Sequence, residues 1–180
     1  MLNKSNNIDS NKLEENFDNL HDPNQIIEKV NEGTGDPTKD RMLRMLAVEK
    51  LDEKEMQKKT EHFLQQFVEY LEPNPRSTIR FVNIFNIVRA VNILSSKKID
   101  NRKLALWIIV VLRWPSLASY LQKNSSFVNY IGNNKVNIPI EIPPNIQSLF
   151  KDKDVDNLFN NKQRIIIDNE TIDDIIIWSI

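Results

Sequence analysis

Apolar residues recur every three or four positions through the middle of this chain, which is the period of an amphipathic α-helix. The pattern predicts a mainly α fold, with a helical bundle of four or more helices over residues 38–124. A small mixed α+β appendage is expected over residues 125–180. Residues 1–37 have few large apolar side chains, so we expect a flexible polar segment there, apart from a short helix at Ile26–Asn31.

Prolines and capping residues place the ends of the helices. Asn74 suits the N-cap position, and Pro75 suits the first helical position, where its missing N–H costs no hydrogen bond. Asp100 is expected to cap the next main helix, which must stop at Trp114 because Pro115 disfavours helical geometry in the residue before it. The predicted bundle helices are one beginning near Thr38, then Asp52–Leu71, Pro75–Leu94, Arg102–Arg113 and Ser116–Lys123.

Beyond Asn124 the pattern becomes mixed. Two segments, Val136–Ile142 and Arg164–Asp168, have the composition of extended chain or short strands. Short helices are predicted at Ile146–Phe150 and Val155–Phe159, followed by a terminal helix at Thr171–Trp178.

The helix predicted from Pro75 carries a compact polar patch. At 100° per residue, Arg76, Arg80 and Asn83 fall within about 60° of one another on its first two turns. Apolar residues are expected to bury most of its other sides, namely Ile79, Val82, Phe85, Ile87, Val88, Val91 and Leu94.

Charge is unevenly distributed along the chain, although the net charge is only −1. Residues 73–114 hold eight bases and one acid, whereas residues 1–72 hold sixteen acids and ten bases. A local positive excess indicates an anionic partner, such as a nucleotide phosphate, nucleic acid or an acidic protein face. The alternative is that this basic segment pairs with the acidic helices before it.

Most kinds of catalytic chemistry lack a framework in this sequence. There is no cysteine, and the two histidines, His21 and His62, are isolated in the sequence from any partner with ligand or triad spacing. Trp107 and Trp114 lie seven residues apart around an apolar helix, a spacing more typical of core packing than of a platform for stacking bases. We therefore expect no enzyme activity from this chain alone.

An acidic repeat, Asp152-x-Asp154-x-Asp156, resembles the opening of a calcium-binding loop. The glycine required at its sixth position is Asn157, and the bidentate glutamate required at its twelfth is Gln163. An acidic turn that caps helices is the favoured interpretation, and no metal site is predicted.

The longest apolar run, Leu104–Leu112, is about half of the roughly 20 residues that span a bilayer. The first residues contain no apolar stretch typical of a secretory signal. We expect no membrane span and a cytoplasmic location.

Two spaced motifs resemble a known family. Asn74-Pro75-Arg76 followed by Arg80-Phe81-Val82-Asn83 resembles the motif that begins the C-terminal helical lid of KAP-type P-loop NTPases, which are relatives of the STAND and AAA+ ATPases. Leu104-Ala105-Leu106-Trp107 and Arg113-Trp114-Pro115 are similar to the apolar helix that follows in that family. The resemblance covers residues 63–121, about a third of the chain.

The resemblance implies a regulatory lid module that senses nucleotide phosphate or couples an NTPase core to a partner. Arg76 would contact the phosphate, Arg80 would support it, and Asn83 would orient both side chains. The three glycines, at positions 33, 35 and 132, cannot form the phosphate-binding loop G-x-x-x-x-G-K-[ST]. We therefore expect no cofactor on this chain alone, and ATP with magnesium only in the presence of an NTPase core. The chain is expected to be a detached or truncated C-terminal portion, or a separate lid-like subunit.

Two alternative functions remain open from the sequence. One is a nucleic-acid-binding helical module whose affinity would fall steeply with salt. Its basic patch would consist of Arg89, Lys97, Lys98, Arg102 and Lys103, together with the arginines at the helix start. The other is a protein-interaction module that binds an acidic helix. A purely structural role, with Arg76 and Arg80 bridging to Glu69 or Glu72, is also open.

Overall fold

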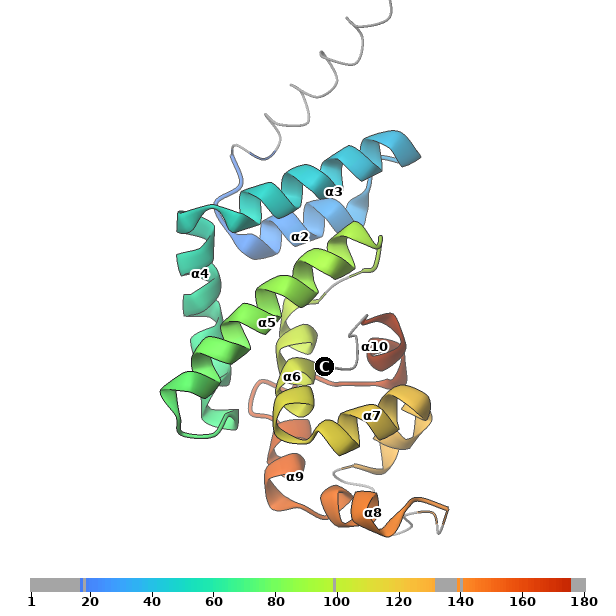
Figure 1. The fold of residues 1–180 in the computed structure, drawn as a ribbon. Helices are drawn as coiled ribbons and strands as arrows, with labels where there is room; N and C mark the ends of the chain where they lie inside the picture. The colour runs from blue at the N-terminus through green and yellow to red at the C-terminus, as the bar shows by residue number, and fades with distance from the viewer. Residues whose placement is uncertain (1–16, 18, 99, 132–138, 140, 176–180) are drawn as a thin grey trace, which may run out of the picture. The chain divides into compact units, whose positions relative to one another are not determined.

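The computed structural model describes residues 17, 19–98, 100–131, 139 and 141–175. Every regular element among these residues is a helix, and none of them is in a strand (Figure 1). The prediction of a mainly α helical bundle is confirmed. The elements are α2 (Pro23–Glu32), α3 (Pro37–Asp52), α4 (Lys54–Leu64), the 3-10 helix η1 (Gln65–Tyr70), α5 (Pro75–Leu94), α6 (Asn101–Arg113), α7 (Pro115–Lys123), the 3-10 helix η2 (Ser125–Tyr130), α8 (Pro144–Phe150), α9 (Lys153–Phe159) and α10 (Asn169–Asp174).

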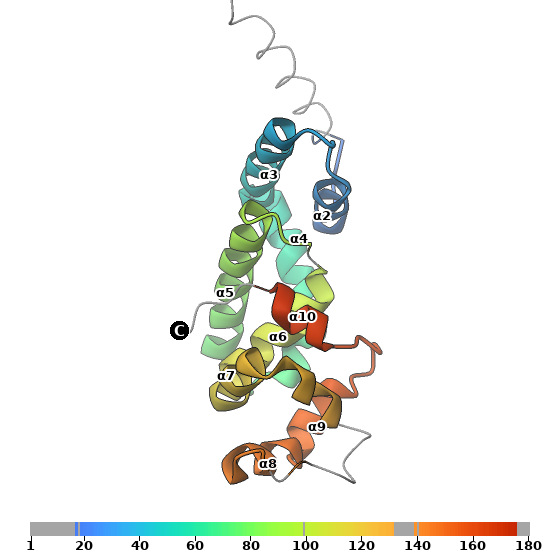
Figure 2. The same ribbon diagram turned by 90° about the vertical axis from the view of Figure 1, so that its right-hand side faces the viewer.

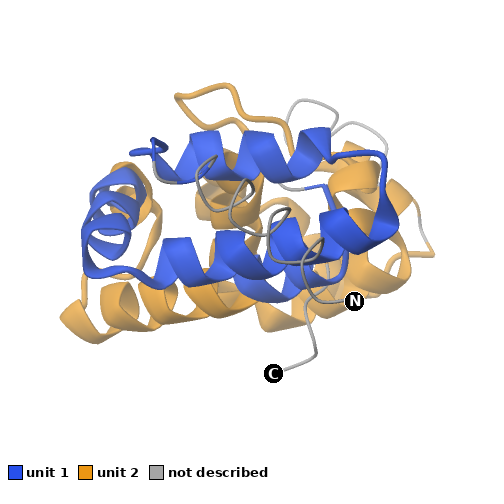
Figure 3. Cartoon of the chain, turned by 90° about the horizontal axis from the view of Figure 1, so that it is seen from above, with its two compact units in different colours: residues 1–65, 89–99 blue, residues 66–88, 100–180 orange. Residues whose placement is uncertain are grey.

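The chain forms two compact units, each assembled from separate segments (Figure 3). Unit 1 comprises residues 1–65 and 89–99, and unit 2 comprises residues 66–88 and 100–180. Helix α5 contributes its residues up to Val88 to unit 2 and those from Arg89 onward to unit 1. The domain boundaries predicted after residues 37 and 124 stay predictions, since compact packing does not show which segments fold independently.

Unit 1 is built on α2, α3 and α4, which pack against one another. Asp22 and Asp36 cap α2 and α3 with their side chains, and each helix has a proline in its first turn. Helix α2 contains the segment predicted as helical at Ile26–Asn31 and buries Ile26 completely. Most of the rest of the segment predicted to be flexible, residues 1–16, lies outside the described residues.

The helix predicted over Asp52–Leu71 is divided in the structure. Helix α3 continues to Asp52, and the extended backbone of Glu53 then ends the helical geometry. Helix α4 follows and runs only to Leu64. The chain continues as the 3-10 helix η1, whose Phe67 and Tyr70 are both buried. Side chains three residues apart superimpose in a 3-10 helix, so this tighter winding brings both rings to one side.

Helix α6 forms the core of unit 2. All seven residues from Leu104 to Val110 are buried, and Trp107 is fully enclosed. Asp100 caps the helix through its side chain, as predicted. The helix ends at Arg113, and Pro115 begins α7, so the predicted break at Trp114 is also confirmed.

The β part of the predicted α+β appendage is not seen among the described residues, because residues 141–175 contain three short helices and no strand. Helices α8 and α9 confirm the two short helices predicted in this region. Helix α10 packs beside α7 and η2 (Figure 2). It ends at Asp174, and the remainder of the predicted terminal helix, from residue 176, lies outside the described residues. Most of Val136–Ile142, predicted as extended, is also outside them.

Arg164–Asp168 was predicted as a strand but has no strand partner among the described residues. The buried side chain of Asn161 makes hydrogen bonds to the backbone groups of Ile165 that a neighbouring strand would otherwise bind. Its Oδ1 accepts from the Ile165 N–H at 2.9 Å, and its Nδ2 donates to the Ile165 carbonyl at 2.7 Å. Arg164 also has a positive φ of 55°, which interrupts the extended backbone.

Candidate functional site

The start of α5 has the local structure that the sequence predicted. The side-chain oxygen of Asn74 accepts the N–H of Arg76 at 2.9 Å, and Pro75 occupies the first helical position. The Asn74 carbonyl also accepts the N–H groups of Ser77 and Thr78. These contacts fix the direction in which the first turn of α5 presents its side chains.

One face of α5 is exposed along its unit 2 portion. Arg76, Arg80 and Asn83 are all exposed, and helical spacing places them on one side. Phe81 and Phe85 lie on the opposite side and are fully buried. The structure therefore brings the three predicted phosphate-sensing residues onto one accessible surface.

More of α5 is exposed than its sequence predicts. Ile79 and Ile87 are 61% and 59% exposed, and Leu94, in unit 1, is 52% exposed. The helical angles of Ile79 and Ile87 place these two side chains on the same side as Arg76 and away from the buried phenylalanines. This surface is part basic and part apolar, and we call it the α5 face. It consists of Arg76, Ile79, Arg80, Asn83 and Ile87.

The guanidinium groups of Arg76 and Arg80 make no ion pair with any residue that the structure describes. Glu69, one of the acids considered as a partner, instead pairs with Lys162 at 2.7 Å. Two unpaired arginines four residues apart can offer forked N–H donors to one phosphate or carboxylate.

One member of the predicted basic patch, Arg89, is buried. Arg89 is only 2% exposed and donates to the buried Thr60 hydroxyl at 3.2 Å within unit 1. Burial lowers the pKa of Arg89 to about 10. Its guanidinium lies in the interior of unit 1, where a large anion has no access.

The other members of the predicted patch differ in exposure and pairing. Lys97, in unit 1, is half-buried, while Lys98 of the same unit is exposed. In unit 2, Arg102 is exposed, with its Nε 3.9 Å from the Asp100 carboxylate. Lys103, in the same unit, is paired with an acid from α10.

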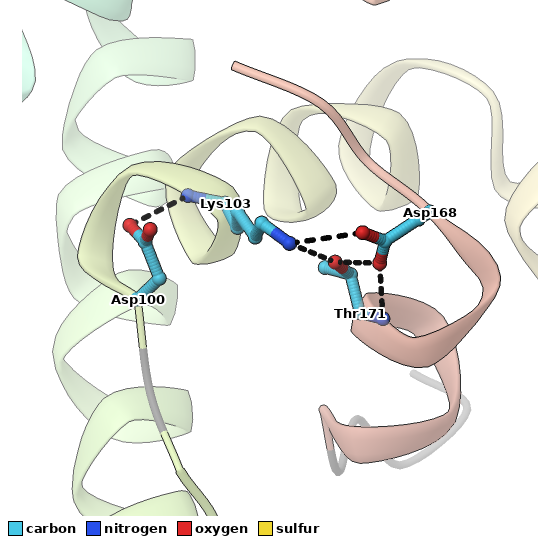
Figure 4. A network of polar contacts seen from close by, with 4 residues as sticks. All are labelled: Asp100, Lys103, Asp168 and Thr171. Carbon is cyan, nitrogen blue, oxygen red and sulfur yellow. Dashed lines mark hydrogen bonds and ion pairs between the residues drawn. The ribbon is translucent and has the colours of Figure 1, made fainter. Parts of the chain in front are cut away.

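That pairing is part of a polar network at the start of α10 (Figure 4). The Lys103 ammonium lies 3.1 Å from Asp168 Oδ2 and 3.0 Å from the Thr171 hydroxyl. Asp168 caps α10 by accepting the N–H and hydroxyl of Thr171 at 2.8 and 2.5 Å. Partial burial raises the pKa of Asp168, but the Thr171 hydrogen bonds and the Lys103 charge outweigh it and hold this pKa at about 2. The network ties α6 to α10 within unit 2.

This network should make the stability of the protein depend on acidity. Because the folded-state pKa of Asp168 lies below its ordinary value of 3.8, its contribution is complete above pH 4 and lost as the pH falls toward 2. Asp168 is about one third exposed, so solvent screening reduces that contribution to about 1 kcal/mol. In urea denaturation, Asp168→Asn should be less stable than wild type at pH 6, and the difference should vanish near pH 2. A constant difference across this range would contradict the assignment.

A polar cavity of about 340 Å³ in unit 2 was not found from the sequence. Arg113 bridges two of its walls, donating to the Tyr70 carbonyl at 2.8 Å and to Asp154 at 2.7 Å. Its guanidinium also lies 4.4 Å from the centre of the Trp114 ring. The remaining lining residues are Glu69, Asn157, Asn160 and Lys162. Its cations are paired with its acids, so this cavity has no net attraction for an ion.

The acidic repeat that resembles a calcium loop makes a helix cap, an ion pair and a hydrogen bond in this region. Asp152 caps α9, Asp154 pairs with Arg113, and Asp156 accepts from Asn160. The predicted acidic, helix-capping turn is confirmed. In the part of the chain that the structure describes, no group of three or more metal-ligating side chains is arranged to hold a metal ion.

No protein-family model matches this sequence, and comparisons with curated proteins and with solved structures find no match either. Among the described residues, no single helix is long and apolar enough to cross a membrane. Helices α6 and α7 satisfy that test only when joined across their bend of 120°.

Proposed function

We propose that this chain is a non-catalytic regulatory module that resembles the lid of KAP-type NTPases. In this proposal the start of α5 contacts the phosphate of a nucleotide held by a separate NTPase core. The observation that carries the proposal is a pair of exposed arginines, Arg76 and Arg80, four residues apart at the capped start of α5, neither of which has an ion-pair partner among the described residues.

Each residue of the motif has a separate role in this proposal. Arg76, in the first turn, contacts the phosphate, where the helix dipole also favours negative charge. Arg80 adds a second guanidinium about 6 Å further along the helix axis. Asn83, exposed on the same face, orients the two arginines through its carboxamide. Since no phosphate-binding loop occurs in this sequence, the nucleotide is held by an NTPase core outside it, either on another protein or in an intact parent chain.

The contrast with three cations of unit 2 supports this assignment. Lys103, Arg113 and Lys162 each form an ion pair with an acid of the same unit. Arg76 and Arg80 have no such partner among the described residues, and so keep their donors available for an external anion. The nucleic-acid alternative has less support, because Arg89 of its basic patch is buried and Lys103 is paired.

Arg76→Gln should weaken the binding of a phosphate chain. With inorganic tripolyphosphate as the probe, we expect about a tenfold loss of affinity, because a charge-assisted forked contact becomes a neutral one. The measurement is an NMR titration of the whole protein, in which the amide signals of residues 76–83 should shift with added tripolyphosphate.

Arg164→Gln is the matched control, because Arg164 is another exposed arginine of unit 2 that forms no ion pair with the residues the structure describes. It should leave the titration unchanged. Equal losses of tripolyphosphate affinity in the two variants would show that only net charge matters, which would contradict the proposal. Magnesium-dependent ATP hydrolysis by the pure protein that is abolished in Arg76→Gln would overturn the non-catalytic assignment.

A further inference from the structure

The apolar half of the α5 face has no role in phosphate binding. Ile79 and Ile87 are each about 60% exposed, and they flank Arg80 and Asn83 on the same side of the helix. Large aliphatic side chains at this level of exposure, placed together beside unpaired arginines, are typical of surfaces that bind another protein.

From this juxtaposition we propose that the α5 face binds an acidic amphipathic helix of a partner protein. Carboxylates of that helix pair with Arg76 and Arg80, and its apolar stripe covers Ile79 and Ile87. The carboxylates and the nucleotide phosphate use the same two arginines and therefore exclude one another. The inference deepens the proposed function, on which it rests, because it names a protein partner that regulates phosphate binding at that site.

Charge complementarity selects this occupant. The α5 face contains two positive charges and no acid, so the surface that covers it must supply negative charge. A second copy of the same face would oppose arginine with arginine, which disfavours self-association. A nucleic acid would place hydrated phosphates against the two isoleucines, and burying those charged groups beside aliphatic surface is unfavourable.

The spacing of the face defines the partner helix. Arg76 and Arg80 are about 6 Å apart along the axis, which matches two carboxylates at positions i and i+4 of a facing helix. Ile79 and Ile87 are about 12 Å apart along the axis and require apolar side chains two turns apart. A helix carrying both patterns packs at an interaxial distance of about 8–10 Å.

The test uses two labelled peptides of about 20 residues, a length at which an alanine-rich helix forms in water. One peptide carries pairs of glutamates four residues apart and, on the same side of the helix, leucines eight residues apart. The other peptide has the same composition in scrambled order. Fluorescence anisotropy with the whole protein should show binding of the patterned peptide and about tenfold weaker binding of the scrambled one.

The double variant Ile79→Ser, Ile87→Ser should reduce the affinity for the patterned peptide about tenfold. The substitutions remove the apolar surface that the two partly exposed isoleucines bury on binding. Tripolyphosphate binding should be unchanged in that variant. Ile166→Ser is the matched control, since Ile166 is 69% exposed elsewhere in unit 2, and it should have no effect on either probe. Circular dichroism of each variant verifies that the helical content is kept.

Three outcomes would overturn the inference: equal binding of the two peptides, unchanged affinity in the double variant, or a short DNA duplex that binds and loses affinity with the double variant. In each case tripolyphosphate binding that depends on Arg76 would leave the proposed function intact. Peptide binding without any tripolyphosphate binding would overturn the phosphate role and support the protein-binding face.

Discussion

Trp107→Ala is expected to cause one of the largest losses of stability of any single substitution in this protein, about 3–5 kcal/mol in the free energy of unfolding. Trp107 is fully buried at the centre of α6, within a run in which every residue from Leu104 to Val110 is buried. Removing the indole leaves a cavity that rigid neighbouring helices fill only in part. Urea denaturation followed by circular dichroism at 222 nm measures the loss.

Trp107→Phe should cost much less than Trp107→Ala. The indole N–H of Trp107 is buried and has no hydrogen-bond partner among the described residues. A buried donor without a partner costs about 1–3 kcal/mol, so replacing the indole by a phenyl ring removes that cost while keeping most of the apolar volume. If the two variants were equally unstable, the indole would not be packed as the structure shows.

Helix α6 also shows why some of the fold was predictable. Asp100 before it and Pro115 after it act within a few residues, through a side-chain cap and a restricted backbone. The nearly continuous apolar run between them requires burial on all sides. Since both signals are local, the sequence alone placed this helix within one residue at its start.

The exposure of α5 was less predictable. Ile79 and Ile87 were expected in the core because they are large and aliphatic, and the sequence does not reveal which arc of a mostly apolar helix lacks a neighbour. The start of the helix was predicted correctly, since Asn74 and Pro75 act locally. Whether Arg76 finds an acid depends on tertiary packing.

Most of the other features that the sequence did not predict are contacts between residues far apart in the chain. The Lys162–Glu69 ion pair joins residues 93 positions apart, and Arg89 meets Thr60 across 29 positions. Charge alone suggested that Arg89 is exposed, because a buried guanidinium is rare. Neither pairing, nor the polar cavity lined by Arg113, leaves a periodic signal in the sequence.

Asn161→Ala should destabilise the protein by about 2–3 kcal/mol, although it removes only a small polar side chain. Asn161 is 4% exposed, and its carboxamide supplies both hydrogen bonds of the Ile165 backbone and a third to the Leu158 carbonyl at 3.2 Å. Alanine leaves these backbone groups without a partner in a region where water has little access, since Ile165 and Leu158 are also buried. Urea denaturation measures the global effect, and hydrogen exchange of the Ile165 amide measures the local one.

Asn160→Ala is the matched control for this substitution. Asn160 is the adjacent asparagine, but it is exposed, and its side chain donates to Asp156 at the surface. The loss of that contact should change stability by less than about 0.5 kcal/mol. If Asn161 replaces a strand partner for Ile165, Asn161→Ala must also accelerate exchange of the Ile165 amide selectively, while the amides in the middle of α6 change only as much as global stability does. An Ile165 amide that stays as protected as in wild type would show that this segment is held by its buried isoleucines, and not by the carboxamide.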